Sequence, residues 1–178
     1  MALSKVQASR ALWWMHWVMA TCFLIIFSVG IYMADLPREV PYRLALFGFH
    51  KSMGMLVLIL LSIRIFLLLR SALPARWPKR PAQWLKTVLL HTFLYTFMLA
   101  LPVSGYYYSN IVGRGVKLFG LPIPSLIPEN KALGELASNL HFWLAYTFLA
   151  FIATHLLVQN RFLVTRWRKL FSPKPSAS

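Results

Sequence analysis

Four long apolar stretches constrain what this chain of 178 residues can fold into. They cover residues 13–33, 44–69, 87–108 and 136–158. Only the second stretch contains charged residues, Lys51 and Arg64. A helix needs about 20 apolar residues to cross a bilayer, and in lipid a helix satisfies its own backbone hydrogen bonds. We therefore predict an all-α fold, an integral membrane four-helix bundle that forms one domain over residues 1–178.

Composition excludes an ordinary soluble domain. Hydrophobic residues make up 58% of the chain and charged residues 13%, whereas soluble domains carry about 25% charged residues. The single cysteine, Cys22, excludes a disulfide framework, a cysteine-rich zinc site, an iron–sulfur cluster and c-type haem attachment. A signal peptide is the alternative for the first stretch, which follows Lys5 and Arg10. Its apolar run is longer than the apolar core of a signal peptide, which has roughly 7–15 residues, and no small-x-small cleavage site follows. Both features favour a membrane span.

The basic residues predict the orientation of the bundle. The chain has 19 Lys and Arg against 4 Asp and Glu. With both termini in the cytoplasm, most basic residues lie inside, including those of a linker at 73–81 and a tail at 161–178. All the acids then lie outside, and so does a loop at 109–135. Because basic residues concentrate on the cytoplasmic side, we predict cytoplasmic termini and interpret the excess charge as a contact for anionic lipid, not nucleic acid.

All five histidines lie within the predicted spans, where ionisable side chains are rare and usually functional. His141 and His155 are 14 residues apart on the fourth span, which places them on nearly one helix face and about 21 Å apart along the axis. The antiparallel course of the first two spans puts His16 level with His155 and His50 level with His141. We therefore predict an inner pair, His16 with His155, and an outer pair, His50 with His141.

Two imidazoles facing each other across a bundle are suited to hold a six-coordinate haem iron. Because both axial positions are then filled, such a haem favours electron transfer over oxygen binding. Zinc or copper fits less well, since those ions take three or four protein ligands and no cysteine or carboxylate lies at either level. A haem-free ion or metal transporter that uses the histidines as a permeation path is an alternative, although no inverted repeat supports it.

Three further residues lie near the predicted haem levels. Arg64 follows His50 by 14 residues and reaches the inner level, where its partner would be a haem propionate. Lys51 would attract an anionic reactant at the outer level. For both residues the alternative is that the charge extends to the membrane interface. His91 has no partner of its own, so we expect it to pack beside the inner haem, bond a propionate, handle a proton for a quinone or exchange with an inner ligand.

The chain resembles the bacterial cytochrome b561 family of diheme membrane proteins, over roughly Ser9 to Arg168. The matching segments are LWWMHW (12–17), GFHKSMG (48–54), RIFLLLR (64–70), His91 with ALPVSG (100–105), and the spacing of His141 and His155. The resemblance implies two b-type haems held by His16, His50, His141 and His155, with His91 not a ligand. It also implies exchange of electrons with ubiquinone, and oxidation of superoxide at the outer face is one activity of this family.

We therefore expect a multi-pass protein of the bacterial inner membrane, an oxidoreductase or electron-transfer protein. Its single cytochrome b domain would move electrons between a small periplasmic reactant such as superoxide and ubiquinone. Lys51, with Arg114 and Lys117, would steer the anion to the outer haem. The alternative is a cytochrome b subunit that relays electrons for a separate dehydrogenase docked on the outer loop.

Overall fold

The structure is a computed structural model that describes residues 5–71 and 81–171, with side chains described at 10–70 and 81–159. It contains the helices α1 (Lys5–Ala34), α2 (Arg43–Ser71), α3 (Pro81–Ile111) and α4 (Gly134–Phe171). Each includes a segment long and apolar enough to cross a membrane. The prediction of an all-α, four-helix membrane bundle is therefore confirmed.

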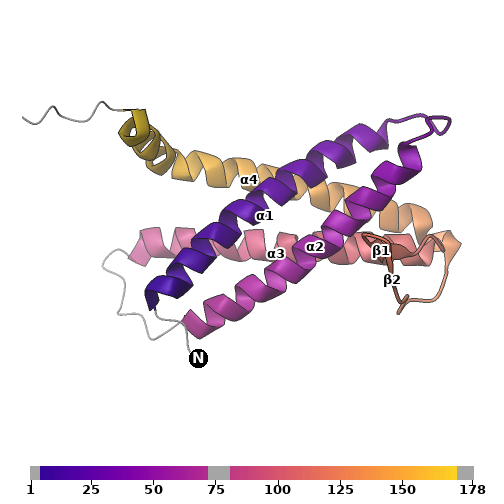
Figure 1. The fold of residues 1–178 in the computed structure, drawn as a ribbon, viewed down its shortest axis with the longest axis horizontal. Helices are drawn as coiled ribbons and strands as arrows, with labels where there is room; N and C mark the ends of the chain where they lie inside the picture. The colour runs from indigo at the N-terminus through magenta and orange to yellow at the C-terminus, as the bar shows by residue number, and fades with distance from the viewer. Residues whose placement is uncertain (1–4, 72–80, 172–178) are drawn as a thin grey trace, which may run out of the picture.

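The helices form two antiparallel pairs, α1 with α2 and α3 with α4, and the first pair crosses the second obliquely (Figure 1). Helix α1 packs along α2, α3 packs along α4, and α2 joins the pairs through α3. The start of α1 and the end of α4 lie at one end of the bundle, opposite the turn between α1 and α2 (Figure 1). We call the end with the α1–α2 turn outer and the opposite end inner, following the orientation predicted from charge.

The helices extend beyond the predicted apolar stretches at both ends. Helix α3 begins at Pro81, where the missing N–H of proline costs nothing because the first turn has no intrahelical acceptor. It continues through the buried Pro102 to Ile111. The predicted linker at 73–81, except Pro81, lies outside the described residues, and the side chains of the predicted tail at 161–178 do too.

The predicted outer loop at 109–135 contains regular structure that the sequence did not reveal. A hairpin of β1 (Val116–Leu118) and β2 (Leu121–Ile123) is followed by a 3-10 helix, η1 (Lys131–Leu133). The hairpin turn has positive φ at Phe119 (46°) and Gly120 (98°), the conformation that two-residue hairpins favour because it matches strand twist. The hydroxyl of Ser52 on α2 lies 2.9 Å from the Lys117 carbonyl and accepts the Phe119 N–H at 3.0 Å. These bonds fix the hairpin on the outer end of the bundle.

A compact apolar layer separates the two histidine levels. Its centre is Phe148, which is 1% exposed and lies on α4 midway between His141 and His155. The ring of Phe148 packs against Phe23 of α1 at 5.1 Å and Phe97 of α3 at 6.1 Å between ring centres. Aromatic contacts of this kind add to burial because the rings meet edge to face or stacked. Val57 and Leu61 of α2 belong to the same buried cluster, so the layer joins all four helices.

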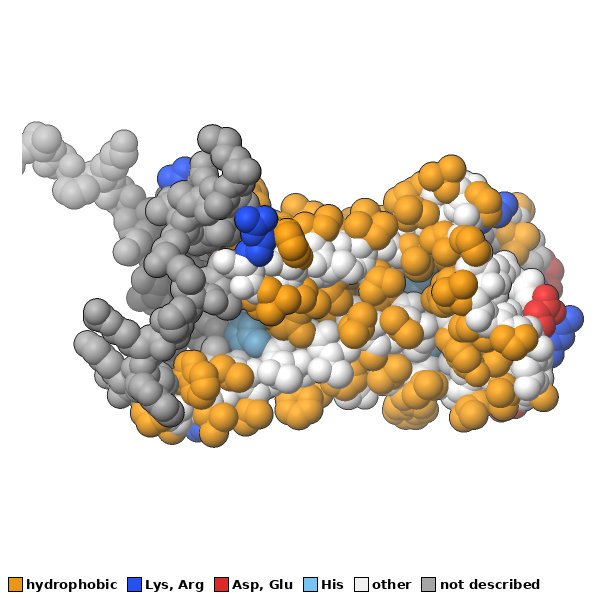
Figure 2. Space-filling model, turned by 90° about the horizontal axis from the view of Figure 1, so that it is seen from below, with side chains coloured by type: hydrophobic (Ala, Val, Ile, Leu, Met, Phe, Trp, Pro, Cys, Tyr) orange, Lys and Arg blue, Asp and Glu red, His pale blue; other side chains and the backbone are white. Residues whose placement is uncertain are grey.

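The surface fits a bilayer. On the face seen in Figure 2, hydrophobic side chains cover the bundle between its two ends, and acidic side chains gather at the outer end. Large apolar side chains that a soluble protein would bury are open here, among them Leu24, Leu69 and Leu157 at 70%, 70% and 73% exposure. Because hydrocarbon tails solvate such side chains as well as a protein core does, this surface is stable in lipid.

Candidate functional site

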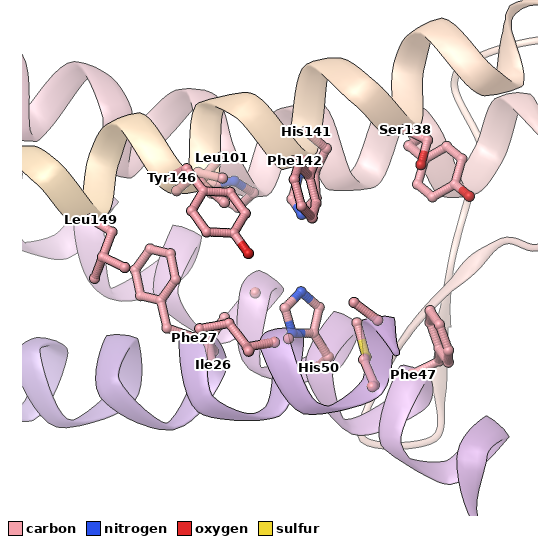
Figure 3. A pocket seen from close by; sticks show the side chains of 18 of the residues that line it. Ile26, Phe27, Phe47, His50, Leu101, Ser138, His141, Phe142, Tyr146 and Leu149 are labelled. Atoms are coloured by element: carbon pink, nitrogen blue, oxygen red, sulfur yellow. The ribbon is translucent and has the colours of Figure 1, made fainter. Parts of the chain in front are cut away.

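The outer pair consists of His50 on α2 and His141 on α4. Their ring centres are 6.3 Å apart and their planes lie at 86° to each other. Both rings line a cavity of about 650 Å³ whose wall also includes apolar residues such as Phe27 and Leu149. Figure 3 shows His50 projecting into this cavity from one side and His141, beside Phe142, from the opposite side. The structure thus brings together two residues that are far apart in the sequence.

The inner pair consists of His16 on α1 and His155 on α4, with ring centres 6.2 Å apart and planes at 64°. His91 of α3 adds a third ring, 5.4 Å from the centre of His155. The Nδ1 atom of His91 lies 2.7 Å from the Thr87 carbonyl of its own helix. The inner level therefore gathers three histidines, of which His16 and His155 repeat the spacing of the outer pair.

The spacing of both pairs fits an iron held between two imidazoles. Rings bound on opposite sides of one metal by bonds of about 2 Å have centres roughly 6 Å apart. The ring centres of His91 and His155 are 5.4 Å apart, which is shorter than this spacing. Nδ1 of His50 and Nδ1 of His155 are buried without a hydrogen-bond partner, so neither ring is engaged in an ordinary polar contact through that atom.

Neither level offers the close cluster of three or more donors that a zinc or copper site needs. Among the residues that the structure describes, no three side chains of His, Cys, Asp or Glu gather closely enough to hold a metal ion. Two imidazoles alone suit a metal that already carries four equatorial ligands, which is the case for haem iron. The donor set at each level therefore fits haem, with an apolar cavity beside the outer pair.

Ser104, which the sequence analysis missed, orients His141. Its hydroxyl lies 2.9 Å from the Leu101 carbonyl and 2.9 Å from Nδ1 of His141. Because the hydroxyl has one hydrogen and the carbonyl can only accept, the hydroxyl donates to Leu101 and accepts Nδ1–H. The lone pair of the ring is then on Nε2. A bond of this kind fixes the tautomer of a metal-binding histidine. The sequence around Ser104 does not indicate this bond, because His141 lies on another helix.

The outer rim of the site is basic. Arg38, Arg43 and Arg114 line the large cavity together with Asp35. Arg43 also donates from Nε to the Leu36 carbonyl at 2.9 Å and closes the turn between α1 and α2. This charge at the mouth of the cavity favours anions, whether the propionates of a haem or a small reactant.

Lys51 lies beside the outer pair and also holds the outer loop. A second hollow of about 90 Å³ is lined by Lys51, Arg114 and both outer histidines. The Lys51 ammonium donates to the Gly115 carbonyl at 2.9 Å. An ammonium has three donors, and this contact uses one of them. The geometry places Lys51 where it can act on an anion near His50 while it anchors the loop.

Arg64 connects three helices at the inner level. Its Nη1 donates to the Leu12 carbonyl of α1 at 2.6 Å, and its Nε donates to the Tyr95 hydroxyl of α3 at 2.8 Å. Two of the five guanidinium N–H donors are used in these contacts. The side chain is thus held inside the bundle near His16, and its predicted contact with a propionate stays a prediction.

The chain is similar to known proteins over most of its length. A family model described as prokaryotic cytochrome b561 matches residues 8–168. The chain is 29% identical over 142 residues to cytochrome b561 homolog 2 of Escherichia coli (strain K12), a match that covers 79% of this chain and 76% of that protein. It is 24% identical over 143 residues to cytochrome b561 homolog 1 of the same organism, covering 80% and 81%.

The family match spans all four helices and includes every histidine of the two pairs. The family resemblance noted from the sequence is therefore confirmed. The chain belongs to the prokaryotic cytochrome b561 family, and it is a multi-pass bacterial membrane protein that binds haem b and takes part in electron transfer.

Proposed function

We propose that this chain is a diheme cytochrome that passes single electrons between a periplasmic reactant and ubiquinone. His50 and His141 would hold the outer haem, and His16 and His155 the inner haem. The observation that carries the proposal is the repeated ring spacing, 6.3 Å at one level and 6.2 Å at the other. Bound between these residues, haem would supply a one-electron couple.

The orientation belongs to the same proposal. We place the outer end in the periplasm and both termini in the cytoplasm, in the bacterial inner membrane. The support is the distribution of charge along the sequence, with every acid on the outer side of the predicted spans. A haem level near each membrane surface would then provide an electron path across the bilayer.

The reactants follow from the family resemblance and the charge at the rim. Superoxide is a small anion, and Lys51 and Arg114 line the hollow beside the outer pair. Two superoxide ions would each lose one electron and become O₂, and one ubiquinone would take both electrons with two protons and become ubiquinol. In this scheme Lys51, Arg114 and Lys117 attract the anion, and the apolar cavity wall keeps water from the outer pair.

The first experiment counts haem and then tests electron delivery. We expect an alkaline pyridine extract of the purified protein to give two b-type haems per chain. Mixing dithionite-reduced protein with a soluble ubiquinone should reoxidise the haem, which the absorption spectrum reports. Reduced protein that stays reduced with quinone would contradict the proposal. Turnover that requires an added dehydrogenase would instead support the alternative of a relay subunit.

The superoxide part has its own variant. Lys51→Gln removes one positive charge beside the outer pair and keeps a donor for the Gly115 carbonyl. We expect a severalfold slower reaction with superoxide and a weaker dependence of its rate on salt, because screening acts on the charge that is lost. Lys131→Gln, which removes a charge of η1 on the same side, is the matched control. Equal rates for the two variants would contradict a steering role for Lys51.

A further inference from the structure

Two glycines lie directly against the outer histidines. Gly30 of α1 faces His50: a methyl group on its Cα would lie 3.1 Å from Cε1 and 3.5 Å from Nδ1 of that ring. Gly105 of α3 faces His141 in the same way, at 3.0 Å from Cε1 and 3.4 Å from Nδ1. Carbon atoms normally approach to about 3.5–4.0 Å, so any side chain at these two positions would push the rings.

The two contacts follow one pattern. Each ring packs against the backbone of the helix paired with its own: His50 of α2 against α1, and His141 of α4 against α3. Each helix pair thus presents one imidazole, supported from behind by its partner helix.

The contact also limits how each ring can turn. In both cases the edge that carries Nδ1 and Cε1 is the one nearest the glycine. In His141, Nε2 also lies 3.7 Å from the position of the added methyl group, and the bond from Nδ1 to Ser104 keeps the lone pair on Nε2. A ring pushed from this edge would turn, and Nε2 would turn with it. The glycines therefore act on the direction of the ligand atom as well as on the space for the ring.

We propose that Gly30 and Gly105 are positioning residues for the outer haem: each lets a ligand histidine lie against a helix backbone at the edge of the cavity. The inference rests on the proposed function, since it takes the outer pair as haem ligands. Of the eight glycines in the chain, these are the two with histidine atoms within reach. Among the side chains that the structure describes, neither His16 nor His155 lies against a glycine, so we expect the effect at the outer level.

Alanine at each position tests the inference. Alanine is the better helix former, so Gly30→Ala and Gly105→Ala add one methyl group without weakening the helix itself. We expect each variant to bind haemin at the outer site roughly 10- to 100-fold more weakly in a titration of the apoprotein, the range found for groups that orient metal ligands. The haem that remains should show the midpoint potential and ferric EPR signal of the inner site.

Gly48→Ala is the matched control. Gly48 lies on α2 two residues before His50, and no atom lies within 4 Å of a methyl group placed there. This variant should keep both haems with unchanged potentials and EPR signals. The retained inner haem of the Gly30 and Gly105 variants reports that they are folded.

The outcomes separate the two proposals. Unchanged outer-site affinity, potential and EPR signal in both Gly30→Ala and Gly105→Ala would overturn the positioning role while leaving the diheme proposal intact. Equal loss from both sites would also overturn it, because the effect would then be a general one on the bundle. Wild-type protein without an outer haem would instead overturn the proposed function.

Discussion

The outer and inner histidine pairs reach nearly the same ring spacing with different supports. The outer rings rest on glycines, line a large cavity and stand at 86° to each other. The inner rings stand at 64°, with a third histidine beside one of them and Arg64 tying the surrounding helices. The shared spacing points to a shared ligand, and the different surroundings point to different tasks for the two levels.

Removal of a ligand should produce the largest difference between the levels. We expect His50→Ala or His141→Ala to remove the outer haem and keep the inner one, and His16→Ala or His155→Ala to do the reverse. A reduced-minus-oxidised spectrum with haem content per chain measures this. His91→Ala is the control and should keep both haems, since the His91 and His155 rings lie closer together than two rings on opposite sides of one iron. Loss of the same single haem in His16→Ala and His50→Ala would contradict the pairing.

Phe148 should affect both levels equally. Phe148→Ala opens a cavity in the layer between them, and such a change in a packed core costs about 3–5 kcal/mol in the free energy of unfolding. Haem release on heating or in denaturant, followed at the Soret band, should occur earlier and at both sites together. Phe66→Ala, at a ring that is 57% exposed, should change little. Destabilisation of one level alone would show that the layer does not couple them.

Arg64 should distinguish the levels by potential. A nearby cation disfavours the ferric state, so Arg64→Gln should lower the midpoint potential of the inner haem by tens of mV, where about 59 mV corresponds to tenfold. The outer haem should keep its potential. Arg64→Lys retains the charge and should retain most of the potential, although it loses the bonds to Leu12 and Tyr95. A shift at the outer haem would contradict the placement of Arg64.

The smallest expected difference is spectroscopic. In a low-spin ferric haem, perpendicular imidazole planes leave two iron d orbitals nearly equal in energy, and tilting the planes toward each other separates them. The outer pair, at 86°, should therefore give the more anisotropic EPR signal, and the inner pair, at 64°, the less anisotropic one. Spectra of the single-haem histidine variants assign the two signals. Identical signals would mean that the ring angles become equal when haem is bound.

Most of the fold was predictable because membrane helices are determined locally. The length of each apolar stretch, the constant rise per residue and the antiparallel course of the chain were enough to place His16 with His155 and His50 with His141 at two levels. The hairpin was missed because its strands have three residues each, too few for an alternating pattern to stand out. The predicted roles of Lys51 and Arg64 stay predictions. The bond from Lys51 to Gly115 and the bonds from Arg64 to Leu12 and Tyr95 had no local signal in the sequence.

The sequence by itself determined the number of helices, the levels of the histidines and the family. Only the tertiary structure decided how each helix is rotated about its axis, and with it the ring angles, the support from Gly30 and Gly105 and the bond from Ser104 to His141. The reason is physical: helices in lipid are apolar on nearly every side, so hydrophobicity does not mark the inward face. Close packing of small residues and a few polar contacts set that rotation, and these act between residues far apart in the chain.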